Sequence, residues 1–270
     1  MLRYEDIQDI SDGNIYEPED EVLLGTGGCK GCSHCCETDM GKSIVLTPYD
    51  IYNLCRASGK SFDELLVGFY IEISMIDGVA LPHLKMDKGC KFLENGRCSI
   101  HTMRPGICRL FPLGRIYQNG DFKYILQVKE CVVQDRTPVT VREWLGIEDL
   151  ETNSKFINKW HKFLGFEQKK VAEIREMSGY ESKRISEIDE GELEVYAGIV
   201  GDAEKWDAMK AEEYRKWKAE AIRAEGEMRV KEVMKLCLKY FYMDPYDFEK
   251  DFYTEFDERM KKSLAAIRKK

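Results

Sequence analysis

The sequence predicts an α+β fold, in which a small, irregular, cysteine-rich metal-binding domain with short strands and helices precedes a mostly α-helical region. Three observations predict this architecture. Nine of the ten cysteines precede residue 135. Closely spaced turn residues divide that half into short segments, whereas apolar residues recur at helical spacing after about residue 150. We therefore expect a metal-binding domain over residues 1–148 and a helical region over 149–270, which can pack together as one unit.

The first elements are short. Residues 1–24 are acidic and poor in aliphatic side chains, so we expect either a loose arm or a first strand lying across the core. Thr47 has the character of an N-cap and Pro48 suits the first turn of the helix that follows it. Ser61 with Glu64 has the form of a capping box and predicts a second helix.

Two β-hairpins and a third short helix complete the expected domain. Residues 71–86 turn at an Asp-Gly pair, and residues 116–128 turn at an Asn-Gly pair. Thr140 with Glu143 then begins a helix that Gly146 ends. We expect the cysteines to fall mainly in the loops between these elements.

The second half of the chain is expected to be helical. Apolar side chains follow helical spacing over residues 156–174, 206–217, 230–241 and 248–264. A polar, Glu-rich stretch over 181–194 interrupts this pattern, and we expect it to be a linker or a long loop. The charge-rich faces of the helices are expected to be solvated surface.

Composition and charge exclude several classes of protein. The formal net charge is −8, whereas a nucleic-acid or anionic-membrane binder needs a basic face, so we expect neither partner. No apolar run approaches the roughly 18 residues of a membrane span. Residues 1–21 are acidic and lack the basic start and apolar core of a secretory signal, so we expect a cytoplasmic location. Cysteines in that reducing compartment serve as metal ligands or redox thiols rather than as disulfides.

The centre of the sequence is a C-x-x-C-x-x-C-C motif made by Cys29, Cys32, Cys35 and Cys36. A C-x-x-C step lets two thiolates on a tight turn face one metal, and loop amides can donate hydrogen bonds to the sulfurs. Side chains of the adjacent pair diverge, so they can serve different metals or different atoms of one cluster. Glycines before and within the motif permit close approach of the backbone to a bulky inorganic group.

A second group of cysteines follows at Cys90, Cys98 and Cys108. An Asn-Gly turn between the first two is expected to bring them together. Cys131, after the second hairpin, can bring an eighth thiolate. Eight thiolates suffice for two four-thiolate sites, or for one cluster with ligands or reactive thiols left over, and the spacing leaves both open.

Arg104 and Arg109 flank Cys108 and are candidate cofactor-binding residues. Four thiolates on one divalent ion leave a formal charge of −2, which two guanidinium groups would offset. The same two arginines could instead hold an anionic substrate or a carboxylate of the fold.

The remaining sulfur and imidazole groups have less distinctive settings. Cys237 lies on the apolar stripe of a helix, and Cys55 lies late in a helical stretch, so both are interpreted as structural. His34, inside the cysteine motif, and His101, three residues after Cys98, are each either a ligand or a hydrogen-bonding neighbour of the site.

The two cysteine groups together resemble the YkgJ-type cysteine-cluster proteins, the zinc- or iron-chelating CxxCxxCC family. The resemblance covers residues 25–135 and departs from the family's usual pattern at Ser33-His34 and at His101. It implies a bound metal, described in the family as an iron–sulfur cluster or zinc, without a settled reaction. The same cysteine signature occurs in flagellin lysine methylases, which makes a modifying enzyme conceivable. The resemblance rests on Cys29, Cys32, Cys35, Cys36, Cys90, Cys98, Arg104-Pro105, Cys108-Arg109 and Phe111-Pro112.

The function expected first is a metal-binding protein that carries an iron–sulfur cluster, of the 4Fe-4S kind, with a redox or protein-modifying role. Zinc is the alternative metal. A zinc-stapled interaction module and a thiol redox sensor are the alternative functions, and enzymatic activity stays open. The sequence contains no P-loop, Rossmann fingerprint or nucleophile elbow. A protein or peptide is the expected kind of partner.

Overall fold

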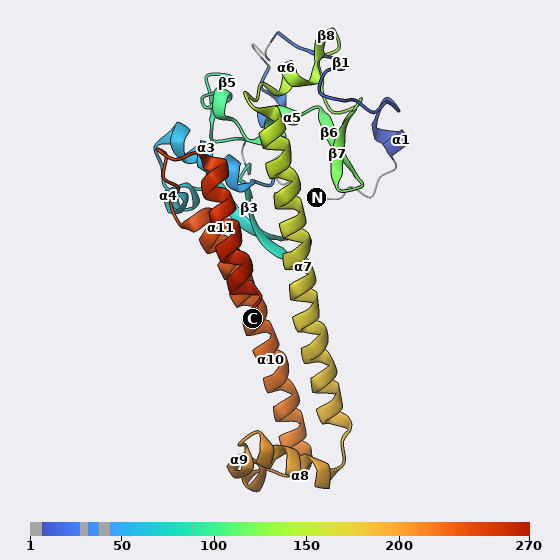
Figure 1. Cartoon of the computed structure of the whole chain (residues 1–270), viewed down its shortest axis with the longest axis vertical. Helices are drawn as coiled ribbons and strands as arrows, with labels where there is room; N and C mark the ends of the chain where they lie inside the picture. Colours follow the sequence, from blue (N-terminus) through green and yellow to red (C-terminus); the bar gives the residue numbers. More distant parts are fainter. Residues whose placement is uncertain (1–6, 28–31, 38–43, 88) are drawn as a thin grey trace.

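A computed structural model describes residues 7–27, 32–37, 44–87 and 89–270. The molecule is elongated (Figure 1). A head of short helices and strands lies at one end, and a hairpin of two long helices, α7 (Leu150–Glu187) and α10 (Ala211–Leu238), extends from it. The α+β class, with short elements first and a mostly helical second part, is confirmed.

The described part of the head contains four antiparallel strand pairs, each of two strands. Both expected hairpins are present, as β2 with β3 and β6 with β7. Their turns begin at Asp77 and Asn119, which adopt positive φ ahead of a glycine. The pairs are β1 (Glu21–Gly25) with β8 (Thr137–Thr140), β2 (Ile71–Ile76) with β3 (Val79–Leu84), β4 (Leu93–Glu94) with β5 (Arg97–Cys98), and β6 (Leu113–Gln118) with β7 (Asp121–Leu126).

The predicted capping residues begin the helices of the head. The hydroxyls of Thr47, Ser61 and Thr140 each accept the backbone N–H of the third helical residue and form capping boxes. Gly146 ends the third of these helices in the left-handed conformation, as expected. The helices of the head are α1 (Ile7–Ile10), α2 (His34–Glu37), α3 (Pro48–Ser58), α4 (Phe62–Val67), η2 (His101–Met103), α5 (Gly106–Leu110) and α6 (Val141–Leu145).

The N-terminal residues supply a strand. Of the two alternatives for residues 1–24, the described part fits the strand: β1 begins at Glu21 and pairs with β8, more than a hundred residues later in the sequence. Val22 and Leu24 alternate into the core, at 3% and 0% exposure. This pairing ties the start of the head to the segment that leads into α6 and α7.

The head and the long helices share one hydrophobic core. The Trp160 ring of α7 lies 5.0 Å from that of Phe241, and Tyr49 of α3 lies 5.0 Å from Phe252. The Tyr242 hydroxyl donates to the Leu46 carbonyl over 3.0 Å. Aromatic burial of this kind is a major source of packing energy. The head is therefore packed against the base of the hairpin rather than tethered to it.

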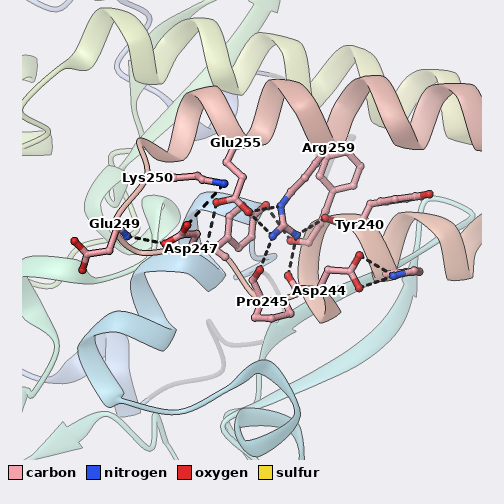
Figure 2. Close-up of polar contacts among 11 residues, drawn as sticks. Tyr240, Asp244, Pro245, Asp247, Glu249, Lys250, Glu255 and Arg259 are labelled. Carbon is pink, nitrogen blue, oxygen red and sulfur yellow. Dashed lines mark hydrogen bonds and ion pairs between the residues drawn. The ribbon is translucent and has the colours of Figure 1, made fainter.

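A hydrogen-bonded clamp fixes the chain reversal after α10 (Figure 2). The π-helical turn η3 (Lys239–Met243) leads through a loop to α11 (Phe252–Ile267), which returns along α10. Arg259 of α11 is 8% exposed and pairs with Glu255 over 2.5 Å. Its guanidinium also donates to three backbone carbonyls, those of Tyr240, Asp244 and Pro245.

The expectation of a linker over residues 181–194 is wrong. Helix α7 continues to Glu187, and α8 (Glu190–Ile199) begins three residues later, capped by the Asp189 carboxylate. The stretch is polar because most of its side chains face solvent, but Ile185 and Leu193 are buried at 2% and 0% exposure. A few inward side chains suffice for a helix that packs on one side, and the periodicity of the sequence did not reveal them.

Candidate metal centre

One cavity in the head gathers the predicted thiols. Its volume is about 110 Å³. One of the eight predicted ligands, Cys29, lies outside the described residues. The sulfur-bearing residues that line the cavity are Cys32, Cys35, Cys36, Cys90, Cys98, Cys108 and Cys131. We call this hollow the cysteine cavity.

Backbone contacts join the two cysteine groups. Helix α2 is a single turn, in which the Cys36 N–H donates to the Ser33 carbonyl over 2.7 Å. The Cys36 carbonyl in turn accepts the Cys90 N–H over 2.7 Å. A Cβ at Gly89, which has a φ of 88°, would lie 3.3 Å from this carbonyl, so the close approach favours glycine. Residues far apart in the sequence thus meet at one wall of the cavity.

A tight hairpin and a short helix carry the other thiols of the second group. Strands β4 and β5 turn at Asn95-Gly96, and Cys98 pairs with Leu93. The Leu93 N–H donates to the Cys90 carbonyl over 2.9 Å, which places the hairpin directly after that cysteine. Cys108 lies in α5.

Asp50 is a site-supporting residue that sequence reasoning missed. Asp50 is 3% exposed, and its carboxylate accepts the Thr47 N–H at the start of α3 over 2.7 Å. It also accepts the Gly106 N–H at the start of α5 over 2.7 Å. Burial raises the pKa of Asp50, and the hydrogen bonds from Gly106 and Thr47 oppose that rise. The only sequence signal was the capping box, which does not reveal the contact to the Cys108 helix.

The thiols are electrostatically coupled. Burial is the main cause that raises the pKa values of Cys90, Cys98 and Cys108, and repulsion between their thiolate forms adds to it. A hydrogen bond within the adjacent pair lowers the pKa of Cys35 to about 7 and raises that of Cys36. Binding of a metal cation would therefore displace protons from buried thiols, and the cation's charge would offset their mutual repulsion.

The two predicted arginines lie in different settings. Arg104 lines the cysteine cavity and donates to the His101 carbonyl over 2.9 Å. Burial raises the pKa of Cys98, and the Arg104 charge opposes that rise. Arg109 instead donates to backbone carbonyls, and so joins the cysteine loops to the end of α6. Its acceptors are the carbonyls of Thr102, Arg104, Leu145 and Gly146.

Apolar side chains complete the cavity wall. Phe92 and Met86 line it and are 4% and 8% exposed. The Trp144 indole, also in the wall, donates to the Phe111 carbonyl over 3.1 Å. An apolar shell limits solvent access and lowers the local dielectric constant. Both effects change the reduction potential of a thiolate-bound metal. Sequence reasoning did not assign these aromatic residues to the site.

The other two cysteines lie elsewhere. Cys237 is fully buried in α10, which confirms its interpretation as a core residue. Cys55, in α3, borders a separate cavity formed with α4 and the loop after η3. Burial raises its pKa to about 11, so this thiol is neutral near physiological pH.

The donor set fits a soft metal, although the sulfurs surround the cavity rather than meet at one point. Among the described residues, no three Cys, His, Asp or Glu side chains form a ready coordination shell. Thiolates favour zinc, copper(I) and iron–sulfur clusters over hard cations. The residues present therefore fit such a group in chemistry and enclosure.

The fold and the site together define a cysteine-rich metal-binding protein. Residues 28–136 match the CxxCxxCC family, described as "Putative zinc- or iron-chelating domain". The matched segment contains all eight predicted thiols. No curated protein and no solved structure matches the chain. Among the described residues, no helix is both long and apolar enough to cross a membrane.

Proposed function

We propose that the cysteine cavity holds an iron–sulfur cluster, of the 4Fe-4S kind, and that the protein has a redox or protein-modifying role. The observation that carries the proposal is the gathering of seven described thiols around one cavity of about 110 Å³. A structural zinc ion needs four ligands and no internal space. The cavity has room for several atoms, because one water-sized atom requires about 10–15 Å³.

The surrounding residues suit such a cluster. The cavity thiols would supply its ligands, and the bound cluster would supply one-electron transfer. Arg104, at the cavity wall, places positive charge beside the thiolates. Phe92 and Trp144 restrict water. Arg109 and Asp50 hold the loop and helix that carry Cys108.

Metal and sulfide analysis of anaerobically purified protein tests this proposal. We expect iron with acid-labile sulfide, and broad visible absorbance that bleaches on reduction. Cys108→Ser should lose most of the iron and sulfide. Cys237→Ser, which alters a fully buried thiol outside the cavity, should retain both. Colourless protein with stoichiometric zinc would reject the cluster.

A zinc-stapled interaction module is the second candidate. The observation that favours it is the size of the sheets, since every strand pair in the described head has two strands. An isolated two-stranded hairpin is marginally stable in water. A closed four-thiolate zinc site would join such pairs without redox chemistry. Stoichiometric zinc, no sulfide and loss of the head's structure on chelation would support this alternative.

A further inference from the structure

The far end of the helical hairpin is a small packed unit of its own. Helices α8 (Glu190–Ile199) and α9 (Ala203–Ala208) close the hairpin at the end opposite the head (Figure 1). This end lies outside the segment that matches the metal-binding family. It has a second hydrophobic cluster, separate from the main core, formed by Ile185, Leu193, Ala197, Tyr214 and Ala219.

An apolar face of this unit points into solvent. Helix α8 packs inward through Leu193 and Ala197, both 0% exposed. Val195 and Ile199 lie one turn apart on the opposite side of the helix. Their exposures are 63% and 79%, and Val200 after the helix is 41% exposed. We call Val195, Ile199 and Val200 the tip face.

Acidic side chains predominate in the segment that carries the tip face. Residues 189–209 contain seven acidic side chains and one basic side chain. This short segment therefore carries most of the chain's net charge of −8. Asp202 is paired with Lys218 over 2.6 Å. Glu190, Glu192 and Glu194 of α8 are exposed, and none of them forms an ion pair within the described part of the chain.

We propose that the tip face docks a protein partner whose surface presents apolar side chains ringed by lysine and arginine. Burial of exposed aliphatic side chains would supply affinity, and the exposed glutamates of α8 would select and steer a basic surface. The same glutamates disfavour nucleic acid, an anionic membrane and a second identical tip, because like charges repel.

The tip face lies at the opposite end of the long helices from the cysteine cavity, so it can bind a partner without covering the cavity. Helix α7 has 38 residues and is about 57 Å long at 1.5 Å per residue. A partner bound at the tip therefore lies far from the cysteine cavity. This inference goes beyond the proposed metal chemistry, since it holds for either metal.

A synthetic amphipathic helix, with leucines on one face and lysines on the other, is a suitable probe. Its binding to the full-length protein can be followed by fluorescence anisotropy at about 0.1 M and about 1 M salt, where the Debye length falls from about 10 Å to about 3 Å. We expect saturable binding that Val195→Ser with Ile199→Ser weakens about tenfold or more. Glu192→Gln with Glu194→Gln should weaken binding about threefold at low salt and flatten its salt dependence.

Matched controls distinguish binding at the tip face from nonspecific binding of the peptide elsewhere on the protein. Val67→Ser alters an equally exposed aliphatic residue, 78% exposed in the head, and should leave binding unchanged. An equal loss in Val67→Ser, or equal binding of a lysine–serine peptide without an apolar face, would overturn the proposal. Sedimentation of the protein alone should show a monomer. A dimer that Val195→Ser with Ile199→Ser dissociates would assign the tip face to a second copy instead.

Discussion

Glu167 is a buried carboxyl group whose protonation affects the stability of the fold. It lies in α7 with 0% exposure, and neither carboxylate oxygen has a hydrogen-bond partner of normal geometry among the described residues. Burial raises the pKa of this carboxyl to about 7, and the nearby Cys237 thiol opposes part of the rise. The folded protein therefore binds a proton that the unfolded chain releases at a lower pH.

We predict that Glu167→Gln changes how stability depends on pH. Protonated Glu167 stabilises the fold below pH 4.5, its ordinary pKa, and this contribution is lost as the pH rises through about 7. The variant should match the wild type near pH 4.5 and exceed it by on the order of 3 kcal/mol above pH 7. Urea unfolding at several pH values measures the difference. The exposed Glu176→Gln serves as control, and parallel curves for all three proteins would contradict the prediction.

Among the elements, the two long helices of the hairpin approach each other closely at a glycine. Gly226 of α10 lies against Ser178 of α7, whose hydroxyl donates to the Ile174 carbonyl over 2.9 Å. A Cβ at Gly226 would lie 2.6 Å from the Ser178 Cβ, which is closer than packed atoms tolerate. Glycine here permits the helices to approach, and its low helix propensity is the cost.

Gly226→Ala should therefore destabilise the protein by about 1–3 kcal/mol, despite the better helix propensity of alanine. Gly179→Ala is a matched control in α7, because a Cβ there meets nothing within 4 Å. It should stabilise by about 0.5–1 kcal/mol. Thermal unfolding of both variants would show shifts of opposite sign. A stabilised Gly226→Ala protein would mean that the helices cross less closely than described.

At the scale of the whole molecule, the structure has two regions with different sources of stability. The head combines two-stranded sheets with the cysteine cavity. The tip has its own apolar cluster at the other end of the hairpin. Energetic coupling between them runs through the long helices, so a change at the cavity need not reach the tip.

Removal of the metal should therefore loosen the head selectively. Under a strong chelator we expect faster amide hydrogen exchange in β4, β5 and α5, because metal-binding energy is folding energy for such loops. Amides of α8 and the distal part of α7 should keep their protection. Reconstitution with the original metal should reverse the change. Unchanged exchange in the head after complete loss of the metal would show that the cysteine loops fold without it.

Local sequence patterns predicted much of the architecture. Asn-Gly and Asp-Gly turns placed the hairpins, and Thr47, Ser61 and Thr140 placed three helix starts. These features depend on neighbouring residues alone. The helix through residues 181–187 was missed, because its stability comes from tertiary contacts of few side chains, such as Ile185, on an otherwise polar surface.

The spacing of the cysteines already indicates the chemistry of the site, since thiols in this pattern suit a soft metal. The residues that support the site become visible only when the chain is folded. Asp50 reaches Gly106 across 56 residues, and Arg109 reaches Leu145 across 36. Such contacts depend on how distant elements pack, which no local spacing encodes. The same packing turned one side of α8 inward and left Val195 and Ile199 exposed at the tip.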